Sequence, residues 1–183
     1  MRIPDSGRKK ALIVVDLQPA FLQKHNQHIV PHTVALLKQV TYDAYVEAVF
    51  SAEKGSIWDE QQEWTSPRNA ETYTVNEVKA WLADKEPLKV DKQTRSVFQG
   101  DKDVATWLKE KEIEEVHVVG TETNDCIMAT AFDAFDAGCL TYIIEECCES
   151  ATEGRHQMGV DILRLQGMTN NRCLVNTIDI PLS

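Results

Sequence analysis

The stretch VHVVGTETNDCIMATAFDAFDAG, residues 116–138, places a cysteine between a strand and a helix. Its first residues, VHVVG, are rich in valine, which is typical of a buried strand of a parallel sheet. Its second half is rich in alanine, carries apolar residues at helical spacing and ends at Gly138, a common residue at helix C-termini. Cys126 falls between the two, in the first turn of the predicted helix. Side chains at such a junction tend to face a cleft, so Cys126 is a candidate for chemistry, although free cysteine usually packs in the core.

The rest of the chain repeats this alternation. Apolar runs predict strands at residues 11–16, 47–52, 87–92, 114–120, 139–147 and 172–178, and helical spacing predicts helices at 31–44, 75–82, 103–113, 125–138 and 154–167. The polar residues 53–73, punctuated by glycine and proline, are expected to form a surface excursion. Strands that alternate with helices predict βαβ units. We expect one domain over residues 1–183, a three-layer α/β/α sandwich of Rossmann type with a mostly parallel sheet of about six strands.

The charge and cysteine content narrow the possible functions. A formal charge of -10 argues against nucleic acid and anionic membranes as partners, because binding to phosphates needs clustered lysine and arginine. No apolar run approaches the ~18 residues of a spanning helix, and the N-terminus shows no signal peptide. The cysteines are odd in number and lack CxxC spacing, which favours reduced thiols. The sequence therefore predicts a cytoplasmic protein.

Three reactive residues fall at the carboxyl ends of predicted strands, where binding groups collect in a parallel sheet. They are Asp16, Lys92 and Cys126. Taken singly, Asp16 could form a turn and Lys92 could be a solvated charge. Thr123 or Asn124 could cap the helix after the strand, so we expect free N–H groups and the helix dipole to lower the pKa of the Cys126 thiol.

Four blocks of the sequence resemble, in order and spacing, the isochorismatase-like cysteine hydrolases, which include nicotinamidases and N-carbamoylsarcosine amidases. The blocks are ALIVVDLQPAF (11–21), DKQTRSVF (91–98), VVGTETNDCIMATAFDAFDAG (118–138) and YIIEECCES (142–150). The resemblance covers roughly residues 11–165. It implies a catalytic triad in which Asp16 is the general base, Lys92 holds the carboxylate and favours the thiolate, and Cys126 attacks an amide-type carbonyl to form a thioester.

The resemblance also implies the surroundings of the nucleophile. A cis peptide would join Thr121 and Glu122, and the backbone N–H groups of Glu122 and Cys126 would form the oxyanion hole. The sequence suggests Phe21, Trp58, Trp64 and Phe98 as residues of the substrate pocket. Trp58 and Trp64 could instead lie in an oligomer interface. Ser96 and Phe98 match the block around the lysine and would position it. Family members usually form homodimers or homotetramers, and we expect the same here.

Two departures from the family limit the chemistry. Nicotinamidases commonly carry a metal site on an Asp-x-His element after the second strand, but residues 50–64, FSAEKGSIWDEQQEW, contain no histidine. His25, His28 and His32 are expected to be polar loop residues, since Pro31 separates the last two. We therefore expect no metal and no cofactor. Isochorismatases proper tend to lack the cysteine, so Cys126 favours amide or carbamoyl chemistry.

The predicted function is hydrolysis of a C–N bond in a small amide-like molecule. The alternatives are a pseudoenzyme that serves as an oligomeric scaffold, or a true nicotinamidase or isochorismatase. A phosphoacceptor receiver would need paired acids after the first strand and a lysine after the fifth, and the chain has neither. A dinucleotide enzyme is disfavoured because no GxGxxG run follows the first strand.

Overall fold

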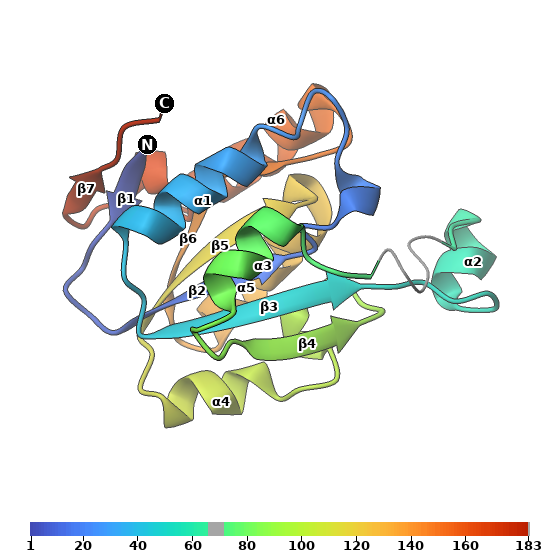
Figure 1. Ribbon diagram of the computed structural model, residues 1–183, viewed down its shortest axis with the longest axis horizontal. Coiled ribbons are helices and arrows are strands. Elements are labelled where there is room, and N and C mark those ends of the chain that lie inside the picture. The colour runs from blue at the N-terminus through green and yellow to red at the C-terminus, as the bar shows by residue number, and fades with distance from the viewer. Residues whose placement is uncertain (66–71, 183) are drawn as a thin grey trace.

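A parallel sheet of five strands forms the centre of the molecule in the computed structural model, which describes residues 1–65 and 72–182 (Figure 1). The order across the sheet is β4-β3-β2-β5-β6. The strands are β2 (Lys10–Val15), β3 (Ala44–Phe50), β4 (Leu88–Lys92), β5 (Glu115–Thr121) and β6 (Leu140–Glu149). Within this sheet the chain begins with the middle strand, β2, continues to β3 and β4 at one edge, and then returns to add β5 and β6 on the other side. Such a reversal creates a crevice at the carboxyl ends of the strands flanking it.

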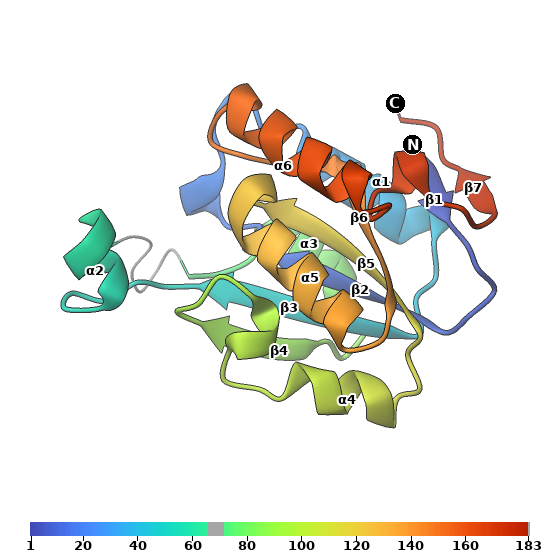
Figure 2. The same cartoon turned by 180° about the vertical axis from the view of Figure 1, so that it is seen from behind.

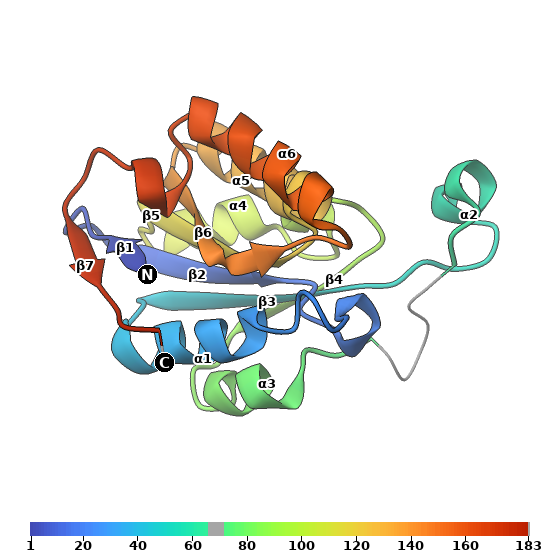
Figure 3. The same cartoon turned by 90° about the horizontal axis from the view of Figure 1, so that it is seen from above.

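Helices cover both faces of the sheet (Figure 3). On one face lie α1 (Ile29–Gln39) and α3 (Asn76–Leu82), and on the other lie α4 (Val104–Glu110), α5 (Met128–Asp136) and α6 (Glu153–Leu165) (Figures 2 and 3). Successive strand residues point to opposite faces, so the apolar run in β2 serves both layers. Ala11, Ile13 and Val15 pack with α4 and α5, while Leu12 and Val14 pack with α1 and α3. The predicted α/β/α sandwich is confirmed.

The last predicted strand, residues 172–178, does not join this sheet. A short turn (Asn170–Arg172) leads into β7 (Thr177–Asp179), which pairs antiparallel with β1 (Arg2–Pro4) in a separate two-stranded sheet. A strand of the parallel sheet is covered on both faces. Leu174 and Ile178 are exposed here, so this segment does not bury enough apolar surface to enter the core.

The surface excursion after β3 carries a short helix, α2 (Ile57–Gln62), which projects beyond the carboxyl ends of β3 and β4 (Figure 1). Ser56 caps this helix by accepting a hydrogen bond from the Asp59 N–H. Part of the predicted excursion, residues 66–71, lies outside the described residues. In the described part of the chain, no helix is long and apolar enough to cross a membrane.

Gly120, near the end of β5, allows β5 to approach β2 unusually closely. Its φ is +124°, and a Cβ built there would lie 1.9 Å from the Val15 carbonyl oxygen. We expect Gly120→Ala to lower the free energy of unfolding by about 3 kcal/mol or more, because it adds a backbone collision to the strained φ. Chemical denaturation measures this loss.

Gly138 provides the matched control, since its φ is also positive but a Cβ there would meet nothing within 4 Å. Gly138→Ala should cost only the strain, about 1 kcal/mol. If both variants lost the same free energy of unfolding, the collision with the Val15 carbonyl oxygen would add nothing to the cost of the strained φ.

Candidate active site

The three reactive residues predicted from the sequence meet at the carboxyl edge of the sheet. Asp16 follows β2, Lys92 ends β4 and Cys126 lies in the turn after β5. The Lys92 ammonium is 2.6 Å from Asp16 Oδ2 and donates a second hydrogen bond, of 3.0 Å, to the Thr94 carbonyl. The exposed fractions of Asp16, Lys92 and Cys126 are only 1%, 3% and 8%. Cys126 contributes to the pKa shifts of both Asp16 and Lys92.

The backbone around Asp16 is fixed from three sides. Asp16 adopts φ +48°, in the left-handed region that aspartate tolerates better than most residues. Its N–H donates to the Ala48 carbonyl at 3.0 Å, and its carbonyl accepts from the Gln18 N–H and the Thr121 hydroxyl at 2.8 and 2.7 Å. Among the described residues, Asp16 Oδ1 is buried and has no hydrogen-bond partner. Lys92 thus holds Oδ2, and Oδ1 is the oxygen that is available to accept a proton.

Cys126 lies in a π-helical turn, Thr123–Ile127, that leads directly into α5. The N–H groups of Asp125 and Ile127, on either side of it, both donate to the Glu122 carbonyl, at 3.0 and 3.1 Å. Such single π turns occur often at functional sites. The peptide bond between Thr121 and Glu122 is cis, as the family resemblance implied.

The electrostatics of the site contradict one expectation. Burial raises the pKa of the Cys126 thiol well above its usual value, and the Asp16 carboxylate raises this pKa further, whereas the Lys92 ammonium opposes both. The predicted lowering of the thiol pKa at the helix start is therefore wrong. Burial also raises the pKa of Asp16 against the opposing effect of Lys92. Burial alone would lower the pKa of Lys92, but Asp16 and Cys126 together outweigh it and raise this pKa.

A raised thiol pKa has a direct consequence for chemical labelling. The thiolate is the species that reacts with iodoacetamide, so the alkylation rate of native Cys126 should keep rising with pH beyond the ~8.5 midpoint of a free thiol. Peptide mass analysis locates the label, and the urea-unfolded chain supplies the unperturbed reference. A rate for Cys126 that levels off below that midpoint would show that the thiol is activated at rest.

A cavity of about 410 Å³ opens beside the turn that carries Cys126. Its lining residues are Ala20, Phe21, Gln23, Trp58, Gln62, Glu63, Trp64, Glu122, Asn124, Asp125, Ala151 and Arg155. Three of the four predicted pocket residues, Phe21, Trp58 and Trp64, are among them. Phe98 is not, because it packs against the core beneath α4 and α5. Ser96 caps a short turn by accepting the Phe98 N–H.

Aromatic packing fixes one wall of this cavity. The Trp64 ring stacks on Phe50 at 5.2 Å, and Phe50 in turn lies 5.0 Å beneath the Lys92 ammonium. Trp58 donates its ring N–H to the Gln93 carbonyl at 2.6 Å. Arg95 stacks on Trp58, with its guanidinium carbon 4.5 Å from the ring centroid, and forms an ion pair with Asp125, next to the nucleophile.

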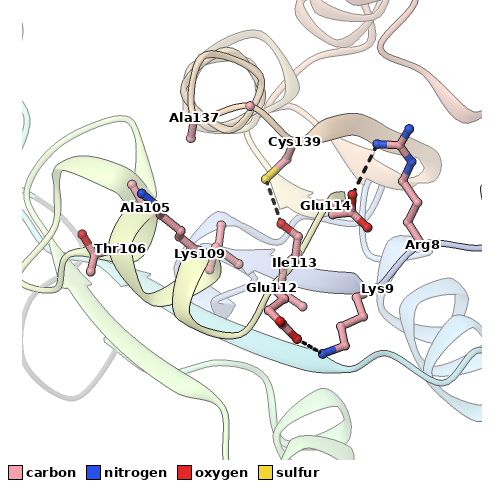
Figure 4. A pocket seen from close by; sticks show the side chains of 12 residues that line it. Arg8, Lys9, Ala105, Thr106, Lys109, Glu112, Ile113, Glu114, Ala137 and Cys139 are labelled. Atoms are coloured by element: carbon pink, nitrogen blue, oxygen red, sulfur yellow. Dashed lines mark hydrogen bonds and ion pairs between the residues drawn. The ribbon is translucent and has the colours of Figure 1, made fainter.

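A larger hollow of about 740 Å³ lies at the opposite, amino ends of the strands (Figure 4). Four of its five charged side chains form ion pairs, Lys9 with Glu112 and Arg8 with Glu114, and Cys139 donates to the Ile113 carbonyl (Figure 4). Its lining contains no residue of the turn that carries Cys126, whereas Glu122, Asn124 and Asp125 of that turn line the 410 Å³ cavity. Size alone therefore does not identify the functional cavity.

Of the three histidines expected in a loop, His25 and His28 precede α1, but His32 lies within it, and the His28 and His32 rings meet edge to face with centroids 5.4 Å apart. His25 bonds to the Ser150 carbonyl at 3.0 Å and His32 to the Glu146 carbonyl at 2.7 Å. Over residues 1–65 and 72–182, no three histidine, cysteine or acidic side chains are grouped to hold a metal. The described residues thus do not fit the metal site that the family resemblance suggests for nicotinamidases.

Sequence reasoning missed several residues that fix this site. The Gln18 side chain forms two hydrogen bonds with the Phe50 backbone, donating to its carbonyl at 3.1 Å and accepting its N–H at 2.7 Å. The segment from Glu149 to His156 bonds to the residues preceding Cys126. In the sequence, only the polar run after the fifth predicted strand could have pointed to the segment from Glu149 to His156.

Fold and site together define an α/β protein in which a buried thiol, a carboxylate and an ammonium group meet at one edge of a parallel sheet. Residues 10–171 match the family described as Isochorismatase domain. The chain therefore belongs to the isochorismatase domain family, as the sequence resemblance indicated.

Individual relatives agree with this assignment. A nicotinamidase from Acinetobacter baylyi (strain ATCC 33305 / BD413 / ADP1) is 40% identical over 47 residues, which are 26% of this chain and 22% of the relative. The structure of an isochorismatase-like hydrolase from Alkaliphilus metalliredigens superposes with a TM-score of 0.72 at 20% identity, covering 88% of this chain and 91% of that one. A pyrazinamidase/nicotinamidase from Streptococcus mutans UA159 gives 0.71 at 21% identity, with coverages of 86% and 96%. At these identities the structures establish a shared fold.

Proposed function

We propose that the protein is a metal-independent hydrolase that cleaves a C–N bond of a small amide or carbamoyl compound. One observation carries the proposal: a buried thiol, carboxylate and ammonium group converge beside a cavity, and one carboxylate oxygen is left without a partner. Hydrolysis of this kind needs a nucleophile, a base that accepts its proton, and a group that orients the base.

The first half of the reaction forms a thioester. The Cys126 thiol is neutral at rest because its pKa is raised, so its proton passes to Asp16 Oδ1 as the sulfur attacks the substrate carbonyl carbon. Lys92 holds Oδ2 throughout. The oxyanion of the tetrahedral intermediate accepts hydrogen bonds from the backbone N–H groups of Glu122 and Cys126. When the intermediate collapses, the C–N bond breaks and Asp16 gives its proton to the departing ammonia or amine.

The second half returns the enzyme to its starting state. A water molecule loses a proton to Asp16 and attacks the thioester carbonyl carbon. The new tetrahedral intermediate collapses, the C–S bond breaks, and the proton returns from Asp16 to Cys126. An amide substrate yields a carboxylic acid, and a carbamoyl substrate yields a carbamic acid that decomposes to carbon dioxide and an amine or ammonia.

Assembly and cellular location are further parts of the proposal. All five cysteines are free, which supports a reducing compartment and hence the cytoplasm. The family resemblance supports a homodimer or homotetramer.

Ammonia release from a panel of small substrates tests the proposed function. The panel contains aliphatic amides, aromatic amides including nicotinamide, and N-carbamoyl amino acids. Saturable release from at least one class, with a carboxylic or carbamic acid as the second product, supports the proposal. Preference for nicotinamide would favour the nicotinamidase alternative. Absence of turnover across the panel would favour the scaffold.

A further inference from the structure

The turn that carries Cys126 is fastened to the junction between β6 and α6 by its side chains. Glu122 accepts the Ala151 N–H at 2.7 Å. Thr123 contacts His156 Nδ1 at 2.9 Å. Asn124 accepts the Ser150 hydroxyl at 2.9 Å. Three consecutive residues ahead of the nucleophile are therefore held by one short segment of chain.

His156 occupies the central position in this arrangement. Its Nδ1 atom lies 2.9 Å from the Thr123 hydroxyl oxygen and 3.3 Å from Glu149 Oε1. We assign the tautomer from these neighbours: because the Glu149 carboxylate can only accept hydrogen bonds, the hydrogen is placed on Nδ1, between Glu149 and Thr123. Thr123 is fully buried, which leaves the histidine as the side chain that fixes its hydroxyl.

The backbone of α6 also touches this turn, three residues beyond His156. A Cβ at Gly159 would lie 2.8 Å from the Asn124 Cα atom. The helix and the turn are thus in direct contact, and the His156 ring has a fixed distance to span. The contact between α6 and the turn therefore limits how far either can move to replace the His156–Thr123 hydrogen bond by another one.

We propose that His156 is a positioning residue that sets the orientation of the nucleophile turn through Thr123. It keeps the Glu122 and Cys126 N–H groups directed at the oxyanion and the Cys126 thiol within reach of Asp16. This role rests on the proposed function, because it concerns the same reaction. His156 itself does not touch the reacting atoms.

Three variants separate this role from a general structural one. His156→Ala removes the Nδ1–H group. His156→Asn keeps it, because the asparagine Nδ2 takes nearly the same place. Gln157→Ala is the matched control, since Gln157 is exposed on α6 and, among the described residues, its side chain bonds to Asp161, at 2.6 Å. We expect His156→Ala to lower kcat by about 10- to 100-fold with KM nearly unchanged, because small misplacements of reacting groups carry costs of this size. His156→Asn and Gln157→Ala should stay within about threefold of the parent.

A second readout does not depend on turnover. If the turn loosens, the Cys126 thiol becomes better solvated, so its alkylation by iodoacetamide should speed up in His156→Ala but not in the other two variants. If no amide is hydrolysed by the parent protein, the proposed function fails, and the alkylation rates alone decide the role of His156.

The proposal is overturned if His156→Ala keeps the kcat and the alkylation rate of the parent. It is also overturned if His156→Asn is as impaired as His156→Ala, because the Nδ1–H bond would then be irrelevant. Should His156→Ala fail to fold, Thr123→Val removes the other partner of the bond with almost no change in shape. It should reproduce the loss of kcat, and a fully active Thr123→Val protein would rule the role out.

Discussion

Cys126→Ala is expected to abolish hydrolysis of any substrate found, lowering kcat/KM by about 10⁴-fold or more. In the proposed mechanism the Cys126 sulfur forms the thioester, and no other cysteine lies at the strand ends that carry Asp16 and Lys92. Cys126 is buried and its side chain is small, so alanine should leave the fold intact. Ammonia release measures the loss, and intact-protein mass during turnover should show an acyl adduct on the parent only.

Cys173→Ala supplies the matched control. Cys173 is partly exposed, makes only a weak sulfur contact to the Val175 carbonyl and lies in the segment between α6 and β7, outside the site. This variant should keep full activity. If Cys126→Ala retained more than a few per cent of the parent rate, the thioester route would be wrong.

Asp16→Asn is expected to remove activity by about 10³-fold or more and to destabilise the fold by about 3–5 kcal/mol. The amide cannot accept the thiol proton, and it leaves the Lys92 ammonium buried without an anion. Asparagine is the appropriate replacement because it tolerates the positive φ of residue 16. Kinetics and chemical denaturation measure the two losses separately.

The double variant Asp16→Asn, Lys92→Met distinguishes catalysis from stability. Replacing both charges removes the buried unpaired ammonium, and substitution of a whole ion pair is often close to neutral. We expect stability to recover to near the parent value while activity stays absent. A double variant as unstable as Asp16→Asn would mean that the charge of Lys92 is not the source of the instability.

The alternation of strands and helices was predictable because β2 and β5 are buried on both faces: β2 reads as a continuous apolar run after Lys10, and β5 is rich in valine although buried Glu115 and His117 interrupt it. The end of the chain was not. Residues around Leu174 and Ile178 have strand-like composition, but whether they join the parallel sheet depends on whether a sheet edge can pair with them and bury them. That is a tertiary property, and the structure pairs β7 with β1 instead.

The candidate site was predictable to the extent that it follows from topology. Asp16, Lys92 and Cys126 sit at strand ends, and parallel strands bring such ends together. The thiol pKa was predicted in the wrong direction because the sequence reveals the nearby helix start but not the depth of burial. The role of His156 depends on how α6 is rotated against the nucleophile turn, which local patterns do not encode.

The projecting segment with α2 and the central sheet contribute different parts of the candidate site. Trp58 and Trp64 stand on this segment, whereas the three reactive groups stand on or next to the strands of the central sheet. In the proposed function, substrate recognition and bond cleavage therefore lie on different parts of the chain, which meet where Trp64 stacks on Phe50 beneath Lys92. An exchange within residues 51–64 that keeps the Trp64–Phe50 stack and the Trp58–Gln93 hydrogen bond would alter the cavity wall and leave the neighbours of Lys92 in place. During evolution, the residues of the sheet can therefore stay the same while substitutions in the projecting segment change the shape of the cavity.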